Sequence, residues 1–222
     1  MIEQHSAQVK FQRHKGGEMD AVIETNIGRD PDYPTMIDFH VTAKAWPENF
    51  TDEQTVVANL RGVITHLPFL GWIDEIPIDY FDSRSAHSFD AYELVEGQTK
   101  KIAAALGLEL KNATDFETLV FFEDADVAEE YRGSGLALRL FREIAYLLKN
   151  NHTLYVLKAH PTGSDLNVSD DDCRKLAAYY LSDQALAFKE VDPIDLPGWL
   201  VGQGSMEIEE TNDSRYFDRK KN

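Results

Sequence analysis

LVFFEDADVAEEYRGSGLALRLFREIAYLLK, residues 119–149, is the most informative part of the sequence. Its first four residues, 119–122, are apolar and predict a short buried strand. An acidic turn should follow, and then the glycine-containing segment 132–137 leads into a long amphipathic helix. A glycine turn at a helix N-terminus presents backbone N–H groups and the positive end of the helix dipole. The sequence therefore predicts an anion site at the start of this helix.

Composition points to a folded domain. The chain has 222 residues, 43% of them hydrophobic, which suits one large domain spanning residues 1–222. No apolar run approaches the roughly 18 residues that a membrane-spanning helix needs, and the first residues lack the apolar core of a signal peptide. The single cysteine, Cys173, fits a reducing compartment. We therefore expect a cytoplasmic protein that does not enter membranes.

Charge and side-chain spacing limit the partners. The net charge of −17 should repel nucleic acid and attract cationic molecules such as polyamines, amino sugars or lysine side chains. An acidic surface also serves solubility alone, so this feature does not identify a ligand. The seven histidines show no metal-ligand spacing, so we expect no metal site.

The rest of the chain predicts further strands and helices around this stretch. Alternating or β-branched apolar residues predict strands at residues 9–12, 19–25, 36–45, 56–66, 72–81 and 152–159, with a loop at 26–34. Residues 60–70 also fit a helix, and residues 72–81, which contain Pro77, also fit an edge segment. Helical spacing predicts a helix over residues 82–106, capped by Ser85 or Ser88 and interrupted at Gly97, and a second helix capped by Ser169. Residues 185–191 and 199–201 should be closing strands, and residues 206–222 read as a charged tail.

Two familiar anion-binding motifs do not fit residues 132–137. A phosphate-binding P-loop requires G-x-x-x-x-G-K-[ST], and this segment has neither the lysine nor the following hydroxyl residue. A dinucleotide fingerprint requires a third glycine where Leu138 stands, and about ten residues separate the predicted strand from Gly133.

A third motif fits better. The segment R-G-S-G-L-A resembles the acyl-CoA loop of the GNAT acyltransferase superfamily, [Q/R]-x-x-G-x-[G/A], with Arg132, Gly135 and Ala137 in the defined places. The later segments HTLYVLKAHP, CRKLAAYY and LAFKEVD resemble the strand, tyrosine-ended helix and strand that follow in this family. The resemblance covers residues 119–191. Ala187 departs from it, because the family usually has glycine before the phenylalanine, and about three extra residues precede Phe188.

The resemblance implies a fold and a reaction. The fold would be mixed α/β (α+β), with a central, mostly antiparallel sheet that is flanked by helices and splayed at the acyl-CoA site. The reaction would be transfer of an acetyl group from acetyl-CoA to a primary amine of a cationic acceptor, either a small molecule or a protein. Dimers are common in this family, and the sequence leaves the oligomeric state open.

The resemblance also implies site residues. Those expected to bind acetyl-CoA are Asp126 and Val127, through a backbone N–H, and Arg132, Gly133, Ser134, Gly135, Leu136 and Ala137. Tyr180, or alternatively Tyr179, would be the general acid for the departing thiolate. A phenol suits this role because its pKa is near or above that of a thiol, so it can donate a proton to a thiolate. Glu123 or Asp124 would serve as the base, and His160 is a candidate for a residue that faces the substrate.

Two alternatives to the acetyltransferase remain open on sequence alone. The same fold could bind acyl-CoA without transfer, or act as an acidic interaction protein that blocks a basic partner. Acetylation of aminoacyl-tRNA is a third hypothesis, although the acidic surface disfavours binding to nucleic acid.

Overall fold

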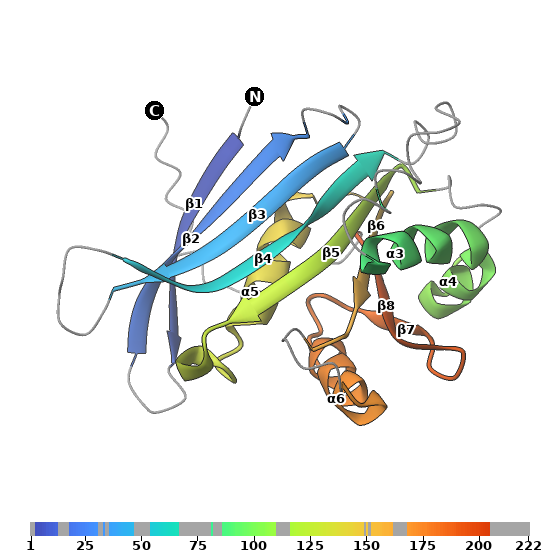
Figure 1. Cartoon of the computed structure of the whole chain (residues 1–222). Coiled ribbons are helices and arrows are strands. Elements are labelled where there is room, and N and C mark those ends of the chain that lie inside the picture. The colour runs from blue at the N-terminus through green and yellow to red at the C-terminus, as the bar shows by residue number, and fades with distance from the viewer. Residues whose placement is uncertain are drawn as a thin grey trace.

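The computed structural model describes residues 3–12, 18–30, 33, 36–46, 54–66, 81, 86–109, 116–148, 150, 152–161 and 168–204. These residues form one eight-stranded sheet with the order β1-β2-β3-β4-β5-β6-β8-β7 (Figure 1). Its strands are β1 (Glu3–Gln12), β2 (Glu18–Arg29), β3 (Met36–Ala45), β4 (Thr55–His66), β5 (Thr118–Val127), β6 (Thr153–Lys158), β7 (Lys189–Asp192) and β8 (Leu196–Gln203). The α-helices of at least eight residues in the described part of the chain are α3 (Ala86–Gly97), α4 (Thr99–Leu106), α5 (Leu136–Leu147) and α6 (Asp170–Leu181).

Strand direction confirms the predicted fold class in its broad form. Strands β1 to β5 form an antiparallel meander, and β8 pairs antiparallel with both β6 and β7. Among the described strands, only β5 and β6 run parallel. A parallel pair needs a crossover, and α5 supplies it. The molecule is therefore a mixed α/β fold with a mostly antiparallel open sheet.

Helices cover the two faces of the sheet with two separate hydrophobic clusters. Residues of α5 and α6, such as Phe141 and Tyr180, pack on one face against Leu60 and Phe122. Residues of α3 and α4, such as Leu94 and Ile102, belong to the cluster on the opposite face. Buried residues alternate between the two clusters along β5 up to Phe122, as expected for a strand with both faces covered. No described helix is long and apolar enough to cross a bilayer.

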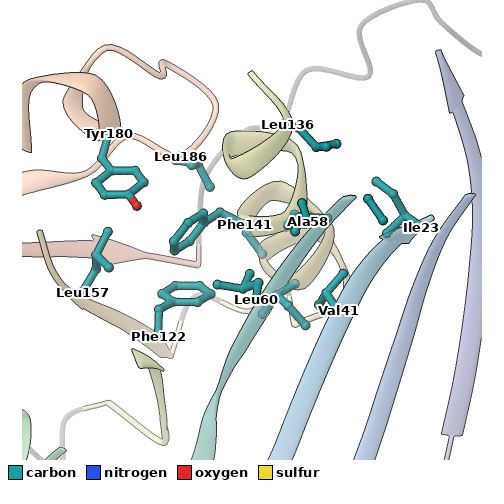
Figure 2. Packing of buried hydrophobic residues seen from close by; sticks show 14 of the residues in the cluster. Ile23, Val41, Ala58, Leu60, Phe122, Leu136, Phe141, Leu157, Tyr180 and Leu186 are labelled. Atoms are coloured by element: carbon teal, nitrogen blue, oxygen red, sulfur yellow. The ribbon is translucent and has the colours of Figure 1, made fainter. Parts of the chain in front are cut away.

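Phe122 is the centre of the α5 cluster. Its ring lies 4.7 Å from that of Phe141 on α5 and 6.0 Å from that of Tyr155 on β6, measured between centroids. Figure 2 shows Phe122, Phe141, Leu157 and Tyr180 gathered between the sheet and α6. The contact with Phe141 is edge-to-face and that with Tyr155 is stacked, and both geometries are preferred by aromatic pairs. This cluster fixes the position of α5 and α6 on β5 and β6.

A β-bulge interrupts the pairing of β4 with β5. Arg61 lies opposite Asp124, and Gly62 lies opposite Phe122, so Glu123 is the extra residue. The bulge reverses the alternation of side chains along β5. Beyond it, Ala125 and Val127 pack against the α5 cluster. The carboxylates of Asp124 and Asp126 therefore lie on the other face of the sheet.

Several predicted elements are confirmed. Strand β3 has the predicted bounds, 36–45, and β4 begins one residue before its predicted start. Helix α6 begins after Ser169, whose Oγ accepts a hydrogen bond from the Asp172 N–H in a capping box. The interruption near Gly97 is also found, because α3 ends there and α4 begins at Thr99.

Other predictions were wrong in their bounds. Residues 26–29 belong to β2 rather than to a loop, because they pair with β3 as far as Arg29, which lies opposite Ile37. The acidic turn predicted after residue 122 is a continuation of β5 as far as Val127. Ser88 does not precede the helix, since it is the third residue of α3.

The closing strands also differ from their predicted ranges. Residues 184–186 form a turn, and Ala187 has a positive φ of 47°, so the strand predicted over 185–191 is β7 at Lys189–Asp192. Strand β8 is longer than its predicted range of 199–201. The predicted strand at 72–81, except Phe81, the predicted cap Ser85 and the tail at 206–222 lie outside the described residues.

Candidate functional site

A cleft of about 410 Å³ opens where the parallel pair of strands ends. Pairing between β5 and β6 stops at Phe122 and Leu157, although β5 continues for five more residues. The cleft is lined by this continuation of β5, by the segment before α5, by the end of β6 and by α6. The cleft therefore exists because β6 does not pair with the last five residues of β5.

Most of the site residues predicted from the sequence come together in this cleft. The predicted residues that line it are Glu123, Asp124, Asp126, Val127, Arg132, Gly133, Gly135, Leu136, Ala137, Tyr179, Tyr180 and His160. Ser134 does not line it. The Ser134 hydroxyl donates to the Tyr131 carbonyl at 2.5 Å and accepts from the Leu136 N–H at 3.4 Å, so it organises the turn instead.

The turn before α5 needs glycine at two positions. Gly133 and Gly135 have φ values of 76° and 79°, a conformation that residues with a side chain rarely adopt. The first hydrogen bond within α5 joins the Arg139 N–H to the Gly135 carbonyl at 3.1 Å. The N–H groups of Ala137 and Leu138 precede this bond and have no intrahelical acceptor. A Cβ atom at Gly135 would meet no other atom within 4 Å, so the space in front of these N–H groups is open.

The end of β5 offers a second set of backbone donors. The Ala128 N–H donates to the Val57 carbonyl at 2.9 Å, which makes these two residues a hydrogen-bonded pair of the β4–β5 ladder. Because such pairs alternate in an antiparallel ladder, the N–H of Asp126 faces β4, and the N–H groups of Ala125 and Val127 face the other way. That side of β5 has no neighbouring strand beyond Phe122. Of the two predicted N–H donors, Asp126 and Val127, only Val127 is thus directed toward the cleft.

Arg132 connects the turn to the strand. Its Nε donates to the Val127 carbonyl at 3.0 Å, and its side chain is exposed. This hydrogen bond uses the carbonyl group of Val127 and does not involve the Val127 N–H. Arg132 thus holds the glycine turn against β5 and leaves a positive charge at the mouth of the cleft.

Tyr180 is the more deeply buried of the two candidate tyrosines. It is 5% exposed, and its ring lies 5.1 Å from that of Phe141 between centroids. No described residue forms a hydrogen bond with its hydroxyl group. Burial, reinforced by the neighbouring Tyr179 and by the Asp124 carboxylate, raises the pKa of Tyr180 far above its ordinary value. Tyr180 therefore stays protonated and can donate a hydrogen bond into the cleft.

Tyr179 lies beside the N-terminus of α5. Burial raises its pKa, and a hydrogen bond from the backbone N–H of Leu138 acts in the opposite direction. The Leu138 N–H, one of the N–H groups without an intrahelical acceptor, therefore lies close to the Tyr179 hydroxyl oxygen. This contact indicates that Tyr179 helps to form the anion site, whereas Tyr180 is closer to the strands.

The candidate bases have different surroundings. The Ser88 hydroxyl of α3 donates to Glu123 Oε1 at 2.8 Å. Arg61 Nη2 lies 2.6 Å from Asp124 Oδ2 in an ion pair on the sheet face opposite α5. The Glu123 carboxylate thus accepts a hydrogen bond from a neutral hydroxyl group, whereas the Asp124 carboxylate is paired with a cation.

Several lining residues were not predicted from the sequence. They are Phe122, Ala125, Tyr131, Phe141, Leu157, Lys158, Pro161 and Leu176. Most are apolar core residues, which carry no signal of a binding site in a sequence. Lys158 is the exception: its Nζ lies 3.1 Å from Asp90 Oδ2 and 5.1 Å from the Trp199 ring centroid. In the sequence, only its position near the end of the predicted strand before His160 indicates that Lys158 lies near the site.

The described residues contain no group of three or more potential metal ligands. Comparison of the chain with protein-family models, with curated proteins and with solved structures finds no match.

Proposed function

We propose that this protein is an N-acyltransferase that uses acyl-CoA, with acetyl-CoA as the expected donor. One observation carries the proposal: β5 and β6 separate at the point where a helix N-terminus, free strand amides and a buried tyrosine line one cleft. This separation corresponds to the splayed strands that the sequence resemblance implies. No single element of this arrangement is specific, but acyl transfer uses all three.

The anion site suits the pyrophosphate of CoA. A pyrophosphate requires several donors and close approach of the backbone, and the glycine turn before α5 supplies both. Arg132, which lines the cleft, adds positive charge in an otherwise acidic protein, whereas the charge of Lys158 is paired with Asp90. The thioester would then lie between β5 and β6, where the Val127 N–H can polarise its carbonyl group.

The proposed transfer forms a carbon–nitrogen bond and breaks a carbon–sulfur bond. A neutral amine nitrogen attacks the thioester carbon, and Glu123 accepts a proton from that nitrogen directly or through water. The carbon–sulfur bond then breaks, and the sulfur leaves as a thiolate, which takes up, through water, the proton that Glu123 accepted from the amine. Tyr180 donates a hydrogen bond to this sulfur. Because the pKa of Tyr180 is raised well above the value of about 8.5 that is typical of a thiol, hydrogen bonding is favoured over complete proton transfer.

Acyl-CoA binding without transfer is a second candidate function. The same burial that keeps Tyr180 protonated makes it a weak acid, which favours a binding protein over an efficient enzyme. Release of free CoA thiol in the presence of amines separates the two functions. Saturable acetyl-CoA binding with no thiol release above the uncatalysed rate would favour the binding protein.

Calorimetric titration of acetyl-CoA against a matched pair of variants tests the proposal. Gly135→Glu places a carboxylate in the anion site and should weaken binding at least tenfold. Gly107→Glu is the control, because Gly107 also has a positive φ, 67°, and an added Cβ there also meets nothing within 4 Å. The two variants carry similar backbone strain, but only Gly135 lines the cleft. Absence of binding by the unmodified protein, or equal loss in both variants, would overturn the assignment.

A further inference from the structure

A second hollow, of about 580 Å³, lies on the sheet face opposite α5. It is lined by residues of β3, β4 and β5, and it shares Asp124 and Asp126 with the cleft. The bulge at Glu123 places both of these carboxylates on this face. The two spaces therefore meet at the same short segment of β5.

Strand register arranges the polar side chains of this hollow in two rows. Thr42 on β3, Asn59 on β4 and Asp126 on β5 are opposite one another, and so are His40, Arg61 and Asp124. Val56 is the only apolar residue among the described residues that line the hollow. A ligand of this surface would therefore be held by hydrogen bonds and charge.

Thr42 distinguishes this hollow from an ordinary solvated sheet face. It is only 8% exposed, yet it lines the hollow, and no described residue forms a hydrogen bond with its hydroxyl group. Most of Thr42 is buried, but its hydroxyl oxygen is not among the described side-chain atoms that are both sealed from solvent and without a partner, so the hydroxyl group is accessible from the hollow, where it can donate or accept a hydrogen bond. A ligand in the hollow could supply the missing partner.

Charge on the same face identifies the kind of ligand. Lys44 neutralises Glu24 at 2.6 Å, and Arg61 neutralises Asp124 at 2.6 Å. Asp126 has no described cationic partner and is exposed. Burial and the nearby Arg61 lower the pKa of His40, so its imidazole is neutral and adds hydrogen-bonding capacity rather than positive charge.

We propose that this hollow binds the amine acceptor, and that the acceptor is a small hydroxylated primary amine whose ammonium group is held by Asp126 and whose hydroxyl groups bond to Thr42, His40 and Asn59. This inference rests on the proposed acyl transfer. The amine would reach the thioester across the end of β5, from the face opposite α5. Two ligands of the reaction would then be bound on the two faces of one sheet.

Calorimetry with two matched ligand pairs tests the amine site on the full chain in the presence of CoA. Serinol and glycerol differ only in the central amino group, and glucosamine and glucose differ in the same way at one carbon. The two amines should bind more tightly than their neutral partners. Asp126→Asn should weaken binding of the amines about tenfold, the effect of one charge-assisted hydrogen bond, and Thr42→Val about threefold.

Asp195→Asn is the charge-matched control, because Asp195 lies between β7 and β8 at the opposite edge of the sheet. It should leave amine affinity unchanged. The inference is overturned if neither amine binds more tightly than its neutral partner, or if Asp126→Asn and Thr42→Val bind the amines as the unmodified protein does. Acetyl-CoA binding is measured separately: its absence would remove the proposed transfer, whereas amine binding that depends on Asp126 would still establish the hollow as an amine site.

Discussion

Arg142 and Asp183 form an ion pair that joins α5 to the end of α6. Nε and Nη2 of Arg142 lie 2.9 Å and 2.6 Å from Oδ2 of Asp183, whose side chain is completely buried. The other oxygen, Oδ1, accepts hydrogen bonds from the N–H groups of Ala185 and Leu186. One carboxylate thus fixes the turn that follows the two candidate tyrosines and ties it to the helix that begins at the anion site.

Replacing Asp183 should destabilise the fold strongly. Asp183→Ala leaves the Arg142 guanidinium and two backbone N–H groups without their acceptor, and we expect a loss of about 3 kcal/mol in the free energy of unfolding. Urea denaturation measures it. Asp195→Ala, at an exposed position, is the control and should change stability little. Equal effects of the two substitutions would show that the buried ion pair contributes nothing.

Gly62 should not tolerate a side chain. It lies beside the bulge, and a Cβ there would collide with the Phe121 carbonyl oxygen and the Phe39 ring. Gly62→Ala should therefore lower the free energy of unfolding by about 3 kcal/mol, the upper range for overpacking. At Gly97, the last residue of α3, a Cβ meets nothing within 4 Å, so Gly97→Ala should stabilise by roughly 0.5 kcal/mol. Thermal unfolding of both variants tests the contrast.

The two tyrosines of the cleft should differ in their effects on turnover. Tyr180→Phe removes the hydroxyl group that donates to the departing sulfur in the proposed mechanism, so the rate of thiol release should fall about 100-fold while the affinity for acetyl-CoA is kept. Tyr179→Phe removes a group beside the anion site, and it should weaken acetyl-CoA binding more than turnover. The reverse pattern in single-turnover kinetics and titration would exchange the two roles.

Alkaline pH should destabilise the protein through its buried phenols. Burial raises the pKa of both Tyr180 and Tyr155 far above the unfolded value of about 10. The native state therefore holds these protons when the unfolded state releases them. The resulting stability is fully present below pH 10 and decreases as pH rises above it. Urea titrations at pH 9 and pH 11 measure the loss, and the double variant Tyr155→Phe/Tyr180→Phe should show a smaller one. An unchanged loss would contradict the prediction.

Replacing Ala187 by glycine should stabilise the protein. The φ of 47° at Ala187 costs a residue with a side chain roughly 1 kcal/mol, and glycine adopts this conformation freely. Ala187→Gly should raise the free energy of unfolding by about 0.5 kcal/mol after the greater entropy of the unfolded chain is counted. Ala185→Gly, two residues earlier and without a positive φ, should lower it by a similar amount. Opposite signs in urea denaturation support the conformational argument, and equal signs contradict it.

Some parts of the fold were predictable because their determinants are local. Strand β3 shows alternation between Met36 and Ala45, and α6 begins at a capping residue followed by three aspartates, so both bounds follow from neighbouring residues. The glycine turn at 133–135 belongs to the same group, because its positive φ values depend on the residue type.

The parts that could not be predicted depend on contacts between distant residues. The sequence of residues 123–127 is acidic and reads as a turn, but pairing with β4 makes it a strand. The direction of Asp124 and Asp126 follows from a bulge opposite Arg61 and Gly62, which no local pattern reveals. The apolar residues of the cleft, such as Phe141 and Leu157, look like ordinary core residues in the sequence, and they line a cleft only because the β5–β6 pairing ends beside them.

At the bulge, the number of residues in β5 matters more than which amino acid occupies position 123. Replacing Glu123 by another residue keeps the count, so Ala125 and Val127 still face the core. Deleting it would shift every following side chain of β5 to the other face and bring two carboxylates into the α5 cluster. The end of β5 should therefore accept many substitutions and no change in length, which is a constraint to apply when distant relatives of this chain are aligned.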